Sequence, residues 1–182
     1  MKKTILAIAA LSALSANSAF AQTYVGGAIG QGHVNLDCAG LSNCDNSDTG
    51  YKIFGGYKFT PNVAGEVTYF NFGKAKASAG GVDATVKGTG VGLGVAFLGD
   101  FAPQWSGVAR LGVASNRVKV DTNPTSSVVG SESSTNAYLG FGIGYEISKG
   151  LQLTGALDFS RAKYQGSSGN IRLATVGLTY GF

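Results

Sequence analysis

Long apolar runs are almost missing from this sequence, which excludes one common way of crossing a membrane. A transmembrane helix needs about 18 to 20 consecutive apolar residues. Past the N-terminal stretch, glycine, charged or turn-forming residues interrupt every run before that length is reached. Charge is also scarce, since 13% of the 182 residues are charged and 44% are hydrophobic. We therefore expect one domain with a large apolar surface, and strands wherever the chain meets lipid.

Cysteine and histidine are nearly absent as well, which argues against a metal centre. The chain has two cysteines, Cys38 and Cys44, and one histidine, His33. These are too few for a tetrahedral zinc site, which takes four ligands. Ser47 and Asp37 lie near His33 in sequence, but their spacing resembles that of ordinary loop residues. We expect no metal, no cofactor and no catalytic site.

Glycine, in contrast, is abundant, with 29 residues against three prolines. There is no Gly-X-Y period, which excludes a collagen-like chain, and the segments between turns are too apolar to stay disordered. The glycines therefore need a structural reason.

The first 21 residues have the organisation of a secretory signal peptide. Lys2 and Lys3 precede an apolar run over residues 5–14, and Ala19-Phe20-Ala21 supplies a small-x-small cleavage pattern before Gln22. The apolar run is too short to span a bilayer as a helix. We expect cleavage between Ala21 and Gln22, which leaves residues 22–182 as one exported domain.

The C-terminal segment, residues 171–182, alternates between two environments. One face carries Ala174, Val176, Leu178, Tyr180 and Phe182, and the other carries threonines and glycines. Tyrosine and tryptophan favour the boundary between hydrocarbon and water, so a row that ends in aromatic residues fits one edge of a bilayer. A strand of a soluble sandwich would show the same alternation.

Seven other segments repeat this pattern. The predicted strands cover residues 23–34, 49–59, 63–72, 85–98, 105–116, 136–146, 151–160 and 171–182. Short turns at residues 60–62, 99–103 and 148–150 alternate with long polar stretches at residues 35–48, 73–84, 119–134 and 162–169. This predicts an all-β fold, an eight-stranded antiparallel up-and-down transmembrane barrel, with short periplasmic turns, long extracellular loops and periplasmic termini. Such a barrel is narrow, so glycines on its inner face would leave room for the few larger side chains.

Three segments resemble a known family. FGGYKFTPNVAGEVTYFNFG at residues 54–73, ARLGV at residues 109–113 and GLTYGF at residues 177–182 are similar to the eight-stranded transmembrane domain of outer membrane protein A and its small-barrel relatives. The resemblance covers nearly all of residues 22–182. It implies an outer-membrane location and recognition of Tyr180 and Phe182 by the barrel assembly machinery. No peptidoglycan-binding domain is expected after the barrel, so the resemblance implies no cell-wall tether.

The predicted inner face carries charges on several strands. Glu66, Arg110 and Asp158 lie on glycine-rich faces, and Lys52 lies on the inner side of its strand. Unpaired ions are costly in a narrow interior, so these charges should pair and fill the lumen. The resemblance implies in addition a gate that can rearrange, but Gly90, Gly92 and Gly94 stand where the family would place a basic partner.

The remaining expectations concern the exported surface. Cys38 and Cys44 share one exported loop, where oxidising conditions favour a disulfide. A basic collar is expected at the outer rim, where it would meet the phosphates of lipopolysaccharide. Its members are Lys74, Lys76, Lys87, Arg117, Lys119, Arg161, Lys163 and Arg172. We expect a monomer and no nucleic-acid partner.

Two classes of function fit these features. One is a structural or surface-interaction barrel with a largely plugged lumen, which presents its loops to lipid or partner molecules. The other is a narrow porin-like channel for ions or small solutes. Inner side chains that fill the lumen favour the first, and a continuous water path would favour the second.

Overall fold

Antiparallel strands make up almost all of the described chain. The computed structural model describes residues 23–34, 43–45, 47–79, 82–123, 127–164 and 167–182. Its strands are β1 (Thr23–Val34), β2 (Asn43–Asp45), β3 (Ser47–Thr60), β4 (Val63–Ala79), β5 (Val82–Ala102), β6 (Trp105–Asn123), β7 (Ser127–Ser148), β8 (Leu151–Tyr164) and β9 (Ser167–Gly181). These ranges contain no helix, and hence none long and apolar enough to cross a membrane.

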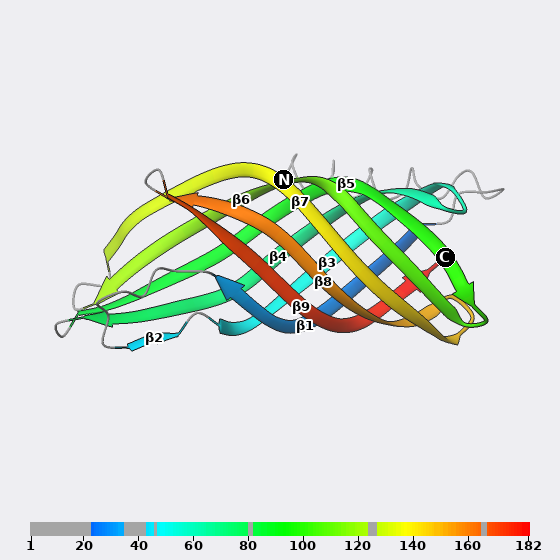
Figure 1. Cartoon of the computed structure of the whole chain (residues 1–182), viewed down its shortest axis with the longest axis horizontal. Helices are drawn as coiled ribbons and strands as arrows, with labels where there is room; N and C mark the ends of the chain where they lie inside the picture. Colours follow the sequence, from blue (N-terminus) through cyan, green and yellow to red (C-terminus); the bar gives the residue numbers. More distant parts are fainter. Residues whose placement is uncertain (1–22, 35–42, 46, 80–81, 124–126, 165–166) are drawn as a thin grey trace, which may run out of the picture.

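The eight long strands close into an up-and-down barrel (Figure 1). Strands consecutive along the chain pair antiparallel, β1 pairs with β3 on one side, and β9 closes the sheet against β1 on the other. The closing ladder runs from Tyr24 opposite Gly181 to Val34 opposite Ile171. Closure gives the backbone groups of both edge strands a partner, as hydrocarbon surroundings demand. The predicted eight-stranded antiparallel barrel is confirmed. The short β2 pairs in addition with the far end of β4.

The predicted polar loops proved wrong in extent, because strands continue far into them. Residues 73–84 belong mostly to β4 and β5, residues 119–134 to β6 and β7, and residues 162–169 to β8 and β9. The fourth polar stretch, residues 35–48, contains β2 and the start of β3. At the opposite end, β5 runs on to Ala102 through most of the predicted turn. A backbone ladder needs no apolar side chains, so pairing continues after the hydrophobic alternation stops.

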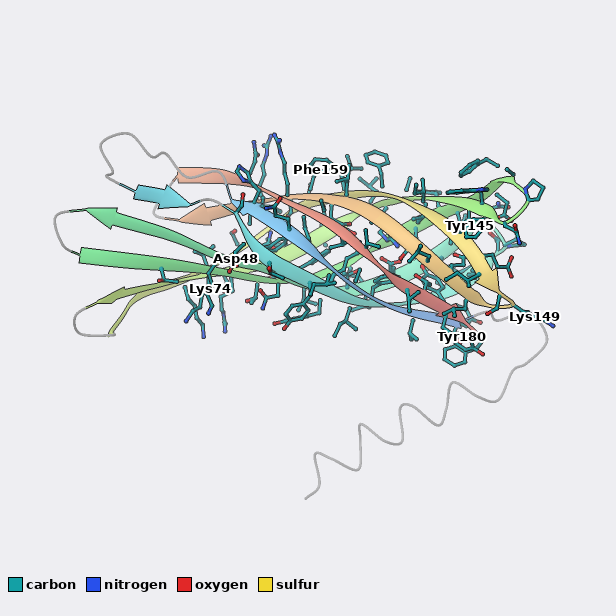
Figure 2. All side chains as sticks on the ribbon, turned by 90° about the horizontal axis from the view of Figure 1, so that it is seen from below. Asp48, Lys74, Tyr145, Lys149, Phe159 and Tyr180 are labelled. Carbon is teal, nitrogen blue, oxygen red and sulfur yellow. The ribbon has the colours of Figure 1, made fainter. Side chains whose placement is uncertain are left out.

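The outer face of the barrel carries a band of apolar side chains. Residues such as Ile53, Leu93 and Phe141 point outward at every second position and are exposed. Aromatic pairs mark the end that carries the short turns, including Trp105 with Tyr145 at 5.0 Å and Tyr180 with Phe182 at 5.1 Å between ring centroids. Figure 2 shows Tyr145 and Tyr180 near Lys149 at this end, and Phe159 towards the other. Aromatic girdles around an apolar band are typical of transmembrane barrels.

A β-bulge in β4 changes which residues face outward. The β4–β5 register shifts between Asn71 and Lys74, and Gly73 has a φ of 80°. A side chain at Gly73 would also lie 2.8 Å from the Cβ of Asp48. Before the bulge the odd-numbered residues of β4 face outward, and after it Lys74 does. The Lys74 amide donates to Asp48 Oδ2 at 2.9 Å, which fixes the bulge against β3.

Candidate functional site

Four charged side chains from four strands meet inside the barrel. Lys52 of β3, Glu66 of β4, Arg110 of β6 and Asp158 of β8 are exposed by only 2%, 4%, 7% and 2%. Each lies on the inner row of its strand, where the neighbouring residues along the chain point outward. The strand alternation therefore directs all four charges into the lumen.

The four charges form two ion pairs. Lys52 Nζ lies 2.5 Å from Asp158 Oδ2, and Arg110 Nε lies 2.7 Å from Glu66 Oε1. The sequence left open whether Arg110 would pair with Glu66 or Asp158, and the structure pairs it with Glu66. Desolvating an ion costs on the order of several kcal/mol, and an opposite charge in direct contact offsets that cost. The pairs make it possible to keep these charges in a closed interior.

Tyrosine hydroxyls complete the environment of both carboxylates. Tyr24 donates to Glu66 Oε2 and Tyr138 donates to Asp158 Oδ1, each at 2.9 Å. Thr68 also donates to Glu66 Oε1, at 3.1 Å. Each carboxylate thus accepts hydrogen bonds from one cation and one phenol. Sequence reasoning missed both tyrosines as partners, although their position on the inner rows of β1 and β7 would have pointed to them.

Phe54 packs between the two cations. Lys52 Nζ lies 5.5 Å from the centroid of the Phe54 ring, and Arg110 Cζ lies 5.1 Å from it. Tyr24 meets the same ring edge-on at a centroid distance of 6.3 Å. Cations are attracted to the face of an aromatic ring, so Phe54 couples the two ion pairs. We call the set Tyr24, Lys52, Phe54, Glu66, Arg110, Tyr138 and Asp158 the ion-pair layer.

Glycines on adjacent strands make room for this layer. Gly140 lies opposite both Arg110 and Asp158, and a Cβ at Gly140 would lie 2.6 Å from Asp158 Oδ1. Gly26 lies opposite Phe54, and a Cβ there would lie 2.7 Å from a carbon of the Phe54 ring. The prediction that small inner residues let larger ones fit is confirmed at these positions.

The lumen differs on the two sides of the ion-pair layer. Towards the end with the long hairpins, called the hairpin end below, buried apolar residues fill the barrel. This apolar cluster comprises Phe70, Phe72, Ala114, Val118, Tyr138, Ile171 and Leu173. Towards the opposite end, which carries the short turns and is called the turn end below, lies a cavity of about 530 Å³. The interior is thus packed on one side of the charges and open on the other.

Basic side chains line up on the outer face at the hairpin end. Lys74 of β4 lies opposite Lys87 of β5, and Lys87 lies opposite Lys119 of β6. Arg117 precedes Lys119 by two residues, so both lie on the same face of β6, and all four side chains are exposed. We call Lys74, Lys87, Lys119 and Arg117 the basic row. Like charges directly opposite each other on neighbouring strands repel, so the row suits an anionic partner.

The other residues of the predicted collar divide into two groups. Arg161 and Arg172 are exposed at the hairpin end on β8 and β9, away from the basic row. The side chains of Lys76 and Lys163 lie outside the described residues.

His33 contacts a serine across two strands. His33 of β1 lies opposite Ser47 of β3, and His33 Nδ1 is 2.9 Å from Ser47 Oγ. The strand register accounts for this contact. Within the described ranges, no group of three or more potential metal ligands comes together.

Three predicted features fall partly or wholly outside the described residues. These are the signal cleavage site at Ala21 and Gln22, Cys38, and the side chain of Cys44, whose backbone lies in β2. Cleavage and the disulfide therefore stay predictions. Tyr180 and Phe182, the predicted assembly signal, are exposed at the turn end, and the Phe182 amide donates to the Thr23 carbonyl at 2.9 Å.

Comparison with known proteins agrees with this architecture. Residues 4–182 match the family model described as outer membrane protein beta-barrel domain. No curated protein sequence matches the chain. Among solved structures, Neisserial surface protein A has a TM-score of 0.63 at 16% identity, covering 88% of this chain and 97% of that one.

Two further structures are similar over most of their length. OprG from Pseudomonas aeruginosa has a TM-score of 0.61 at 15% identity, covering 90% of this chain and 96% of its own. Ail of Yersinia pestis, solved in complex with the heparin analogue sucrose octasulfate, has a TM-score of 0.60 at 16% identity, covering 90% of this chain and 100% of its own. At these identities the similarity concerns the fold alone.

Proposed function

Because the chain belongs to the outer membrane protein beta-barrel family, we propose that it is an integral outer-membrane protein with a plugged lumen that acts through its hairpin end. The observation that carries the proposal is the filled interior. The ion-pair layer and the apolar cluster lie in series along the barrel axis, and both consist of buried side chains. An ion that crosses the barrel would have to break hydrogen-bonded ion pairs and enter a dry apolar region.

Planar-bilayer recording of the refolded protein tests the plug. We expect no conductance steps above those of the protein-free bilayer at moderate voltage. Folding is checked in parallel by the mobility of the unheated protein on gels. Sustained, ohmic steps from folded wild-type protein would contradict the plug.

A narrow channel is the second candidate, and the cavity at the turn end favours it. About 530 Å³ of the lumen on that side is open. A path through the whole barrel would need the apolar cluster to move as well. Replacing Phe70, which at 1% exposure is the most deeply buried aromatic side chain of that cluster, by alanine removes its ring. If the cluster is the outer part of the plug, Phe70→Ala should conduct more than wild type.

The surface role rests on the basic row. Three lysines in register, with an arginine beside them, stand at the hairpin end, beyond the apolar band. We propose that the basic row contacts the phosphate groups of lipopolysaccharide, since lysines near a membrane surface attract anionic headgroups over a short, salt-screened range. In this orientation the hairpins face outward, and the short turns and both ends of the barrel chain face the periplasm.

Lipopolysaccharide added to detergent-solubilised protein tests this contact. It should raise the unfolding temperature of the wild type, and the double variant Lys74→Gln/Lys119→Gln should lose most of that rise. Lys149→Gln, at the turn end, is the matched control and should respond like the wild type. The contact is refuted if the double variant responds fully, or if 0.5 M salt leaves the wild-type shift unchanged.

The proposal includes export and assembly. We propose cleavage after Ala21, recognition of the aromatic end Tyr180 and Phe182 by the barrel assembly machinery, and a monomeric barrel in the membrane. Exposure of Tyr180 and Phe182 at the turn end supports their accessibility to an assembly factor. N-terminal sequencing of the mature protein should begin at Gln22. Replacing Phe182 by alanine should slow insertion into the membrane in cells.

A further inference from the structure

The cavity at the turn end has a closed floor and an open mouth. Its floor is formed by residues of the ion-pair layer, namely Tyr24, Lys52, Phe54 and Arg110. Its mouth is bordered by turn residues such as Asn62, and by Phe182. The apolar cluster lies beyond the floor. The cavity is therefore a blind pocket entered from the turn end.

The charges around the pocket are distributed unevenly. Lys52 and Arg110 line its floor, whereas their partners Asp158 and Glu66 are not among the described residues that line it. Both ion pairs thus turn their cationic member towards the pocket. The floor of the pocket is therefore positively charged, although the two cations and two carboxylates of the ion-pair layer sum to no net charge.

The wall and mouth add further charges. Lys58 and Lys149 also line the pocket, and the acidic side chain among its described lining residues is Asp100. Asp100 lies at the mouth, near the end of β5, and is therefore remote from the cations at the floor. Field lines concentrate in a narrow cavity with low-dielectric walls, which strengthens the attraction for an anion.

The guanidinium of Arg110, at the floor, has more hydrogen-bond donors than its ion pair with Glu66 uses. A guanidinium carries five N–H donors, and the hydrogen bond described for Arg110 uses one of them, Nε, which donates to Glu66. Arg110 is 7% exposed, and its Nη1 is buried with no hydrogen-bond partner in the described part of the chain. Nη1 is too buried to meet a ligand directly, so it contributes positive charge beneath the floor, while other parts of Arg110 line the pocket.

We propose that this pocket binds a small organic anion, whose phosphate or carboxylate group is held at the floor by Arg110 and Lys52. The volume of about 530 Å³ lies in the range of small-molecule sites. Polar side chains on the wall give the body of the ligand hydrogen-bond partners, and they are Ser106, Gln152, Thr154 and Thr179. The proposal goes beyond the plugged surface protein described above. It stands whichever compartment the turn end faces.

Calorimetric titration of the refolded full barrel chain in nonionic detergent at low salt tests the pocket. The probes are glucose 6-phosphate and succinate, with glucose as the neutral control. We expect one equivalent of at least one anion to bind at least tenfold more tightly than glucose and to raise the unfolding temperature. The two anions distinguish a phosphate ester from a carboxylate as the preferred group. The proposal is overturned if the folded wild type binds neither anion at millimolar concentration.

Two variants locate the binding. Thr154→Trp places a large ring in the pocket and should abolish binding, while the mobility of the unheated protein reports that it is folded. Lys149→Glu reverses one charge at the mouth and should weaken binding about threefold to tenfold. Lys119→Glu, exposed at the hairpin end, is its matched control and should bind like the wild type. Full binding by folded Thr154→Trp would place the anion elsewhere and overturn the proposal. Bilayer conductance tests the plug separately, so the two proposals can fail independently.

Discussion

At the scale of single residues, the interior depends on matching large side chains with glycines. Tyr24 lies opposite Gly56, and Phe54 lies opposite Gly26 on the neighbouring strand. A narrow barrel cannot hold two large inner side chains at the same level of adjacent strands, so each needs a small neighbour. The high glycine content is therefore a condition for placing aromatic and charged side chains in the lumen.

Arg110 provides the first prediction at this scale. Arg110→Ala leaves Glu66 buried without its cation, which should destabilise the folded barrel by about 3 to 5 kcal/mol. Urea unfolding in detergent micelles measures the loss. Arg117→Ala, which removes an exposed arginine, should change the stability little.

A double-mutant cycle then tests the pairing itself. Arg110→Ala and Glu66→Ala should be strongly coupled, and Arg110→Ala and Asp158→Ala less so, because Asp158 is paired with Lys52. Two additive cycles would contradict the observed pairing.

Gly140 provides the second prediction. Gly140→Ala puts a methyl group 2.6 Å from Asp158 Oδ1 and 3.0 Å from the Tyr138 hydroxyl. Overpacking of this kind typically costs about 1 to 3 kcal/mol. The same measurement on Gly27→Ala serves as the control, because a Cβ at Gly27 would meet no atom within 4 Å. Equal stability of the two variants would count against steric crowding at Gly140.

At the scale of elements, the bulge in β4 determines where the basic row lies. Without the extra residue at this point, strand alternation would turn Lys74 towards the lumen. The backbone of Gly73, with a φ of 80°, suits glycine because it has no Cβ. The bulge thus links a backbone conformation to the charge pattern of the outer surface.

Replacing Gly73 tests this link. Gly73→Ala should destabilise the barrel by about 1 to 3 kcal/mol, because it imposes an unfavourable φ and crowds Asp48. Gly99→Ala is the control, since a Cβ there would meet no atom within 4 Å. Chemical unfolding compares the two variants. A cost no larger than that of Gly99→Ala would show that the bulge tolerates a side chain.

The segment before β3 carries the disulfide prediction. Cys38 and Cys44 are expected to form one bond, since both lie in the same exported stretch. Mass spectrometry of unreduced protein from the cell envelope should find the two cysteines in one linked peptide. Two alkylated, free thiols would refute the bond.

At the scale of the whole molecule, the barrel is asymmetric along its axis. The hairpin end has long strands (Figure 1), the basic row and a filled lumen, whereas the turn end has aromatic pairs and the open pocket. The strands β5 and β7 have 21 and 22 residues, about twice the 9 to 11 that a tilted strand needs to cross a bilayer. The surplus lies at the hairpin end, so this end extends far into water.

Labelling of intact cells tests the orientation. Single cysteines at Lys119 and Lys149, placed in a background with Cys38 and Cys44 replaced by serine, mark the two ends. A membrane-impermeant maleimide should modify the cysteine at position 119 and not the one at position 149. Permeabilised cells, in which both should react, provide the control. Labelling of position 149 in intact cells would reverse the proposed topology.

Local pattern was sufficient to predict the barrel. The alternation of residues along each strand is a property of a few consecutive positions, and it identified eight strands, their inner faces and the charges that point inward. Lys52, Glu66, Arg110 and Asp158 were found in this way. The strand ends were not, because outside the apolar band both faces are polar and the alternation disappears.

Contacts between distant residues were decided only by the tertiary structure. Lys52 and Asp158 are 106 residues apart, and they meet because the barrel closes and its strands are staggered. The sequence placed Arg110 inside but could not choose its partner, since the choice depends on the relative heights of β4, β6 and β8. The orientation of Lys74 depends on a bulge of one residue. The pocket depends on how far along the barrel axis the large inner side chains of several strands extend. Alternation determines which face a side chain occupies, whereas closure and stagger determine what it meets there.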